Sequence, residues 1–189
     1  MLRRVLTVAA AGFFLAVAEL RAEDCAIGAF SNASADGWTF NIGKEFKGAQ
    51  GNFAVLEGLG PDSGGVAYLE GAFGKGGAYV AIDRKLETAI PFKTLKFKLK
   101  SFDLESVTIR LTDSTGQVHQ QVLSLKNSSD WQMVEVKSYK GSGYVSWGGA
   151  KDGKWHDPLC GVSLLLEHSG LKDGAHSGKA LFSAVSLSK

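Results

Sequence analysis

The sequence has almost no net charge, and this lack limits its partners. Its 21 Lys and Arg residues are nearly balanced by 19 Asp and Glu residues, for a formal net charge of +2. Without residues 1–22, which contain three Arg and one Glu, the counts become 21 − 3 = 18 and 19 − 1 = 18. A neutral surface provides no long-range attraction toward phosphate groups. We therefore expect no nucleic-acid partner.

The sequence also lacks an apolar run long enough to cross a membrane. The longest run, residues 5–18, has about 14 residues, whereas a spanning helix needs about 20. It follows Arg3 and Arg4 and is followed by small residues near Ala22, which is the pattern of a secretory signal peptide. We expect a signal peptide at residues 1–22, one domain at 23–189, and a secreted or periplasmic location. A retained signal anchor is the alternative.

Only two cysteines are present, Cys25 and Cys160. An even count in an exported chain favours a disulfide bond. Closing so long a loop would stabilise the fold by about 4 kcal/mol in the chain-entropy model, if the geometry permits. A lipid anchor on Cys25 is the rival interpretation, but the four residues before it, RAED, do not resemble a lipoprotein signal. The sequence therefore predicts a Cys25–Cys160 disulfide.

Helical periodicity is nearly absent, and alternation with a period of two takes its place. In KTLKFKLK, three apolar residues alternate with lysines, so Leu95, Phe97 and Leu99 are predicted to face a core. In VTIRLTD, Val107, Ile109 and Leu111 are predicted to point inward and Arg110 outward, and the same alternation at Gln132, Val134 and Val136 after Trp131 predicts another strand. Further candidate strands, bounded by turn-forming residues, are GWTFNI, FAVLEG, GVAYLEG, GAYVAID, QVHQQVLSL, GVSLLLEH and KALFSAVSLS. The pattern predicts an all-β fold, an antiparallel β-sandwich of the jelly-roll type in a single domain.

Recognisable catalytic motifs are missing as well. The chain has no G-x-S-x-G nucleophile elbow and no H-E-x-x-H zinc motif. The glycine-rich stretches GLGPDSGG and GAFGKGGAY lack the ending of a phosphate-binding loop and are interpreted as turns. A protein without enzymatic activity is expected. Glycoside cleavage needs only two suitably spaced carboxyl groups, so a glycan-active hydrolase or lyase stays as an alternative.

The histidines do not have the spacing of a metal site. His156 stands next to Asp157, and His168 and His176 are too far apart in sequence for a zinc motif. Calcium sites use oxygen ligands from turns, which leave no compact sequence signature. We therefore predict no certain cofactor and leave a structural calcium open.

One segment, YVSWGGAKDGKWHDPLCG at residues 144–161, is polar and glycine-rich yet carries two tryptophans. Sugar rings stack on indole faces while their hydroxyl groups need hydrogen-bonding partners. Trp147, Trp155 and His156 supply both properties in this segment. Four residues on nearby candidate strands add polar groups: Arg110, Gln117, His119 and Gln121. The alternatives are that Trp147 fills the core and Trp155 anchors a loop, and Trp38 and Trp131 are interpreted as core or rim residues.

Several phrases resemble galactose-binding-like β-sandwich domains of the carbohydrate-binding-module type. They are GWTFNIGKEFKGAQG, GGAYVAI, IRLTDSTGQVHQQ, DWQMVEV and WGGAKDGKWHDPL, and the resemblance extends from about Phe30 to Leu187. It implies a jelly roll that recognises a polysaccharide or glycoside and frequently holds a structural calcium. Carried over by position, it implies a polar and aromatic cluster of Arg110, Asp113, Gln117, His119, Gln121, Trp147 and Trp155.

Together these features predict an exported, non-catalytic carbohydrate-binding module that uses exposed Trp and polar side chains. The predicted ligand-binding residues are Arg110, Asp113, Gln117, His119, Gln121, Trp147, Trp155 and His156. The second interpretation is a periplasmic protein-interaction or envelope-assembly sandwich that uses the same segment as an interface. The expected partner is thus a polysaccharide or glycoside, or a periplasmic protein.

Overall fold

The structure is a computed structural model that describes residues 24–126, 130–137 and 144–188. The predicted signal peptide at residues 1–22 lies outside these described residues. Among them, no helix has the length and apolar character that crossing a membrane requires.

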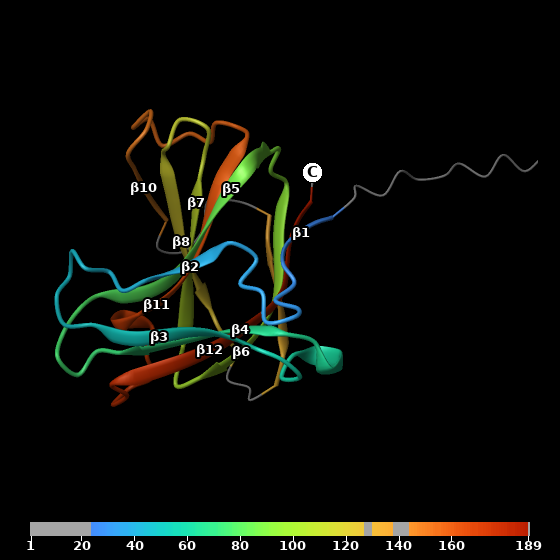
Figure 1. Ribbon diagram of the computed structural model, residues 1–189. Helices are drawn as coiled ribbons and strands as arrows, with labels where there is room; N and C mark the ends of the chain where they lie inside the picture. The colour runs from blue at the N-terminus through green and yellow to red at the C-terminus, as the bar shows by residue number, and fades with distance from the viewer. Residues whose placement is uncertain (1–23, 127–129, 138–143, 189) are drawn as a thin grey trace, which may run out of the picture.

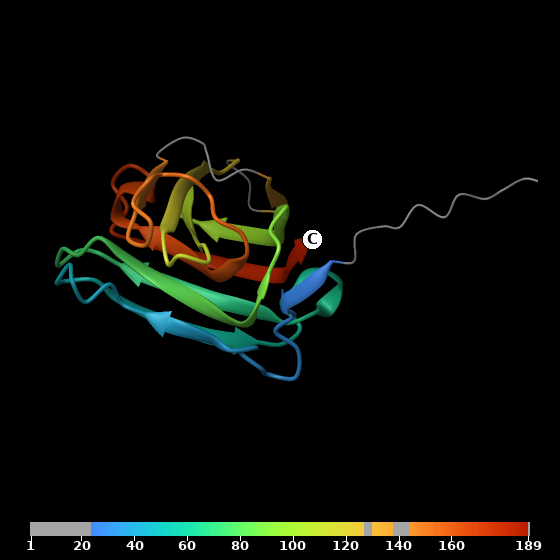
Figure 2. The same ribbon diagram turned by 90° about the horizontal axis from the view of Figure 1, so that it is seen from above.

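Two antiparallel sheets form the molecule (Figure 1). Sheet A has the strand order β3 (Gln50–Leu56), β4 (Val66–Ala72), β12 (Ser177–Ser188), β6 (Thr94–Phe102) and β9 (Gln132–Val136). A sixth strand, β1 (Cys25–Gly28), pairs with β12, so the first described strand lies beside the C-terminal one (Figure 2). Sheet B has the order β10 (Val145–Trp147), β8 (Val118–Ser124), β7 (Ser106–Thr112), β11 (Leu159–Glu167), β5 (Tyr79–Ile90) and β2 (Trp38–Asn41). Two short 3₁₀ turns, η1 (Pro61–Ser63) and η2 (His168–Gly170), complete the described elements.

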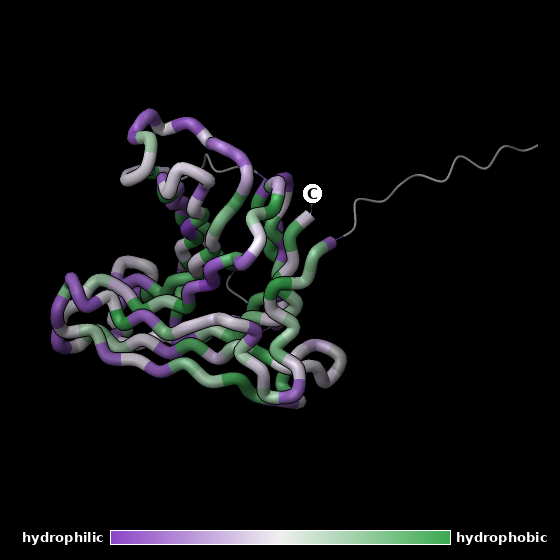
Figure 3. The backbone as a smooth tube through the Cα atoms, turned by 45° about the horizontal axis from the view of Figure 1, so that its top comes forward, coloured by the Kyte–Doolittle hydropathy of each residue, from purple (hydrophilic) through white to green (hydrophobic). Residues whose placement is uncertain are grey.

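The core lies between the two sheets and is built from the apolar half of each alternating strand. Leu95, Phe97 and Leu99 of β6 are buried there, and Ile109 and Leu111 of β7 face them from sheet B. Burying one such side chain stabilises the fold by about 2 kcal/mol. Figure 3 shows the same division along the chain, because hydrophobic and hydrophilic residues alternate along the strands.

The predicted all-β antiparallel sandwich is therefore confirmed. All the candidate strands exist, and lysines 96, 98 and 100 lie on the outer side of β6 as the alternation predicted. Two strands were missed, β1 and β10. They are only four and three residues long, which is too short for alternation to show.

The predicted disulfide is wrong, because Cys25 and Cys160 are both free thiols. Cys25 lies on β1 opposite Leu187 in sheet A and packs against the core. Cys160 lies on β11 in sheet B and borders a hollow on its outer face. Packed sheets are about 10 Å apart, whereas a disulfide requires Cα atoms within about 7 Å.

Thiol titration checks this correction directly. Protein denatured without a reducing agent is expected to show two reactive thiols, because the two cysteines lie in different sheets and form no disulfide bond. A protein carrying Cys25→Ser serves as the control and should show one. Finding no reactive thiol in the unreduced protein would show that the Cys25–Cys160 disulfide forms after all.

Candidate functional site

The outer face of sheet B carries the other half of each alternating strand. Register places Gln120, Arg110, Ser163, Asp83 and Thr39 next to one another, one from each of β8, β7, β11, β5 and β2. Neighbouring strands lie about 4.8 Å apart, so the five strands that carry this row span about 19 Å. The face therefore presents a row of hydrogen-bonding side chains long enough for several linked sugar units.

Arg110 is the centre of this face. Its guanidinium carbon lies 4.4 Å from the centroid of the Tyr79 ring and 5.3 Å from that of the Trp147 ring. Its Nε donates a hydrogen bond to Oε1 of Gln120 at 2.7 Å, and its terminal nitrogen lies 4.0 Å from Oε1 of Glu167. Cation–π contacts of this kind hold the flat guanidinium against aromatic rings. Arg110 thus joins two aromatic residues from distant strands.

Carboxylates on the outer face take hydrogen bonds from neighbouring strands. Glu167 accepts one from the Thr108 hydroxyl at 2.9 Å, and Asp83 accepts one from the Asn41 amide at 2.9 Å. Glu45 accepts one from the Tyr79 hydroxyl. Burial raises the pKa of Tyr79, and the bond to Glu45 raises it further, so this phenol stays protonated and remains a donor.

Two aromatic rings remain open to solvent at this face. Trp147 is 42% exposed at the β10 edge, and Phe46 is 52% exposed in the loop between β2 and β3. The Phe46 ring packs edge-on against Tyr79, with centroids 6.2 Å apart. Tyr79 itself is buried, together with Ala81 and Leu165, in a small apolar cluster. The exposed rings are therefore Trp147 and Phe46.

Two hollows lie along β5 and β11. One, of about 330 Å³, is bordered by Asp83, Lys85, Thr112, Gly161 and Ser163, which belong to the outward-facing set. The other, of about 440 Å³, lies where β5 begins and β11 ends, at Ala78, Glu167 and His168. One hollow therefore borders Ser163, which pairs with Arg110, and the other borders Glu167, which lies 4.0 Å from Arg110.

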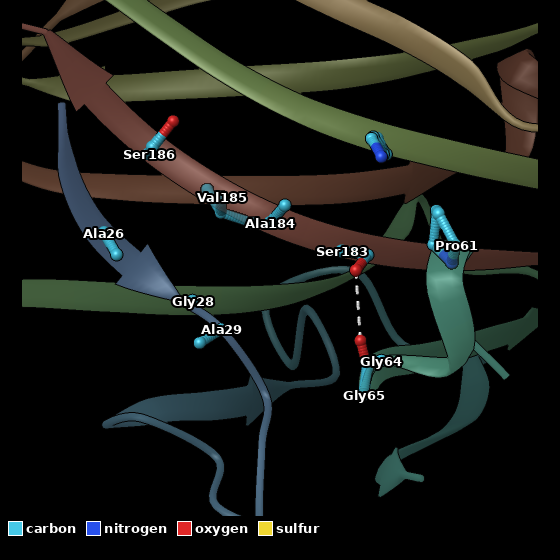
Figure 4. A pocket seen from close by; sticks show the side chains of 11 residues that line it. Ala26, Gly28, Ala29, Pro61, Gly64, Gly65, Ser183, Ala184, Val185 and Ser186 are labelled. Carbon is cyan, nitrogen blue, oxygen red and sulfur yellow. Dashed lines mark hydrogen bonds between the residues drawn. The ribbon is translucent and has the colours of Figure 1, made fainter. Parts of the chain in front are cut away.

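A further cavity, of about 400 Å³, is on sheet A (Figure 4). It lies beside β12 between β1 and the turn at Pro61, where the Ser183 hydroxyl donates a hydrogen bond to the Gly65 carbonyl at 3.0 Å. Its lining consists mostly of Ala, Gly and Ser, with Lys98 as its charged side chain. Without an aromatic ring among its lining residues, this cavity lacks the stacking surface that a sugar needs.

The structure divides the predicted ligand-binding residues into two sets. Arg110 and Trp147 lie together on the outer face of sheet B. Asp113, Gln117 and His119 lie instead under the loop that follows β10, and each is at most 1% exposed. We expected these three residues to contact a ligand directly. Because they are enclosed, they support the loop after β10 instead.

Gln121 also requires correction. It is 6% exposed and stands opposite Ile109, so its side chain points between the sheets. Trp155 is partly buried against the core, as the alternative interpretation had it, and its indole nitrogen donates to Oδ1 of Asp157 at 2.8 Å. His156 is half-buried, with Nε2 3.1 Å from both carboxylate oxygens of Asp152.

The three enclosed residues and the half-buried Tyr144 form what we term the Asp113 network: Asp113, Gln117, His119 and Tyr144. Oδ1 of Asp113 accepts hydrogen bonds from the Thr115 hydroxyl and from the backbone N–H groups of Thr115 and Gln117, at 2.7–3.0 Å. Oδ2 contacts Nε2 of His119 at 3.1 Å and the backbone nitrogen of His156 at 3.3 Å. Burial raises the pKa of Asp113, but these hydrogen bonds outweigh it and hold the pKa below 3.8.

Sequence reasoning missed Phe46, Tyr79 and Glu167 as members of this face. Phe46 had a usable signal, since GKEFKG places an aromatic residue in a polar, glycine-bounded loop. Tyr79 and Glu167 begin and end strands, so only the strand register shows that they meet. Among the described residues, no group of three or more His, Cys, Asp and Glu gathers in a way that could hold a metal ion.

Comparisons with known proteins show what this architecture resembles. No family model matches the sequence, and no curated protein matches it either. Among solved structures, the family 11 carbohydrate-binding module of a cellulosomal cellulase of Clostridium thermocellum matches with a TM-score of 0.65 and 13% identity, covering 88% of this chain and 95% of that one. The chain therefore has a β-sandwich of the carbohydrate-binding-module type, which confirms the resemblance at the level of fold.

Two similar structures contain ligands. The family 11 module from Clostridium thermocellum in complex with a β-1,3-1,4-mixed-linked tetrasaccharide matches with a TM-score of 0.58 and 13% identity, covering 80% of this chain and 88% of that one. A family 29 carbohydrate-binding module variant complexed with mannohexaose matches with a TM-score of 0.52 and 13% identity, covering 89% and 93%.

The Asp113 network predicts a specific loss of stability in acid. Asp113 and Asp152 both have pKa values below 3.8, about 2 for Asp152, whose carboxylate accepts bonds from the Lys154 backbone N–H and from His156. The fold thus favours their ionised forms, and this stabilisation is present above about pH 4 and lost as the pH falls toward 2. Asp113→Asn should lower the free energy of unfolding at pH 7 by about 1–3 kcal/mol and reduce the further loss in acid.

Urea unfolding at pH 7, 4 and 2.5 measures both effects. Asp173→Asn is the control, since Asp173 is an exposed carboxylate outside the network. If Asp113→Asn shows the same acid dependence as the unchanged protein, Asp113 is not the residue responsible.

Proposed function

We propose that this protein is an exported, non-catalytic carbohydrate-binding module that binds a polysaccharide on the outer face of sheet B. The observation that carries the proposal is the combination of two exposed rings, Trp147 and Phe46, with the hydrogen-bonding row between them. Aromatic faces pack against the C–H patches of sugars, and amide, guanidinium and carboxylate groups satisfy sugar hydroxyls. The solved neighbours with oligosaccharide ligands support the same interpretation.

The charges on this face favour a neutral ligand. Glu167 stands 4.0 Å from Arg110 and offsets its charge, and both side chains are 19% exposed. A sugar acid approaching Arg110 would therefore meet the carboxylate of Glu167 as well. Asp83 and Glu45 add two more carboxylates near the row, and the exposed Lys85 adds one further cation, so neither sign of charge dominates. We infer a neutral polysaccharide or glycoside as the ligand class.

Export is part of this proposal, and its only support is the N-terminal sequence pattern. The basic start, the apolar run and the small residues before position 23 support cleavage and transfer out of the cytoplasm. A secreted or periplasmic protein would meet extracellular or cell-envelope polysaccharides directly.

Substitution of Trp147 tests the binding face. Trp147→Ala is expected to weaken polysaccharide binding at least tenfold, because truncating an aromatic residue central to an interface costs about 2 kcal/mol. Affinity electrophoresis through gels containing mixed-linked β-1,3-1,4-glucan, glucomannan, xylan or polygalacturonate measures the retardation. Retardation should be strongest in a neutral polysaccharide, and the melting temperature should change little, since Trp147 lies on a three-residue edge strand and is not part of the core.

Phe102→Ala is the matched control. Phe102 is 41% exposed, almost the same as Trp147, but it ends β6 in sheet A. Equal losses in the two variants, or no retardation of the unchanged protein in any gel, would contradict the proposal. Capture of a single periplasmic protein instead would favour the protein-interaction function, and release of reducing ends from the panel would favour a hydrolase or lyase.

A further inference from the structure

The strand that carries Trp147 has little packing of its own. β10 has three residues, and it pairs with β8 alone at the edge of sheet B. Val145 is 48% exposed and Trp147 is 42% exposed. Burial is the main source of strand stability, so three residues with this exposure do not fix the direction of an indole ring. Something outside β10 has to hold Trp147 beside Arg110.

Anchors exist on both sides of β10: the one before the strand attaches to β8, and the one after it attaches to the turn between β7 and β8. Before the strand, the Tyr144 hydroxyl lies 2.9 Å from Nδ1 of His119. After it, the backbone N–H of Ala150 donates to the Thr115 hydroxyl at 3.1 Å, and Gln117 exchanges hydrogen bonds with Gly153 and Lys154. The loop after β10 and the β7–β8 turn accordingly lie together at the top of Figure 1.

Tyr144 and His119 connect these two anchors. The Tyr144 hydroxyl lies within hydrogen-bond distance of two groups, the Gly153 carbonyl oxygen at 3.1 Å and Nδ1 of His119 at 2.9 Å. The other ring nitrogen of His119, Nε2, lies 3.1 Å from the Asp113 carboxylate. The phenol hydroxyl is thus bonded both to the β8 side chain and to the loop after Trp147. Removing that one oxygen releases both connections.

We propose that His119 and Tyr144 are positioning residues for Trp147. They hold the indole ring at the edge of the outer face of sheet B without reaching that face themselves. His119 is 1% exposed and points between the sheets, on the side opposite Arg110. The predicted effect on ligand affinity rests on the proposed function, whereas the predicted effect on the position of the Trp147 ring does not.

The test measures the environment of the Trp147 ring directly. In protein labelled with 5-fluorotryptophan, Trp147 gives one of four fluorine resonances, assigned by Trp147→Phe. In Tyr144→Phe, this resonance is expected to move toward the position of a freely exposed indole and to lose its response to Arg110→Lys. The Trp38 resonance should stay in place, because Trp38 is 2% exposed in the core and reports an intact fold. His119→Asn should act in the same direction.

Tyr68→Phe is the matched control. Its hydroxyl makes a comparable hydrogen bond, donated to Oε2 of Glu70 at 2.8 Å, but it lies on sheet A. This variant should leave the Trp147 resonance unchanged. If Tyr144→Phe also leaves it unchanged while Trp38 reports a folded protein, the positioning role is overturned. The spectrum of Tyr144→Phe decides this even if His119→Asn does not fold.

A binding measurement separates this inference from the proposed function. On mixed-linked β-1,3-1,4-glucan or glucomannan, whichever retards the unchanged protein more, Tyr144→Phe should weaken binding about tenfold, which corresponds to one net hydrogen bond. Tyr68→Phe should bind normally. If the unchanged protein binds neither polysaccharide, the proposed function fails, but the fluorine spectra still decide the positioning role. A displaced ring with unaltered binding would overturn the link between Trp147 position and affinity.

Discussion

The strict alternation of side chains along sheet B is the constraint on which the rest of the structure depends. Each strand must give one set of residues to the core, so only the other set is available for chemistry. In β7, Val107, Ile109 and Leu111 are committed to the core, and Arg110 is thereby directed to the outer face. The same rule sends His119 and Gln121 of the adjacent β8 inward and Gln120 outward. A shift of one residue in register would exchange the two sets completely.

Much of the fold could be predicted from this rule, but the membership of the site could not. The patterns KTLKFKLK and VTIRLTD show which residues face inward because apolar and polar residues alternate clearly. In QVHQQV, by contrast, polar residues occupy both faces, so the inward direction of His119 follows only from its pairing with Leu111. Tyr79 and Glu167 also meet only because β5 pairs with β11, which is distant in sequence. No local sequence pattern predicts this contact. The disulfide prediction was wrong for a related reason, since an even number of cysteines says nothing about which sheet each cysteine occupies.

The structure contains two kinds of polar assembly, one on the outer face of sheet B and one under the loop after β10. On the outer face, Arg110 and Glu167 are partly exposed, and their contacts leave oxygen and nitrogen atoms able to exchange partners with a ligand. Under the loop after β10, Asp113 is 1% exposed and accepts hydrogen bonds at both carboxylate oxygens. Buried polar groups are costly to disrupt once satisfied, so this interior assembly is suited to fixing geometry. Under the proposed function, recognition and rigidity therefore depend on different residues.

The position of Arg110 over Tyr79 also affects the thermodynamics of binding. Because the guanidinium and Phe46 already cover the phenol ring, which is 3% exposed, Tyr79 has almost no apolar surface left to lose to a ligand. The newly dehydrated apolar surface would come mainly from the open parts of Trp147, Phe46 and Val145. Heat capacity follows apolar dehydration, so association with a polysaccharide would carry a small negative heat-capacity change, and its enthalpy would vary little with temperature.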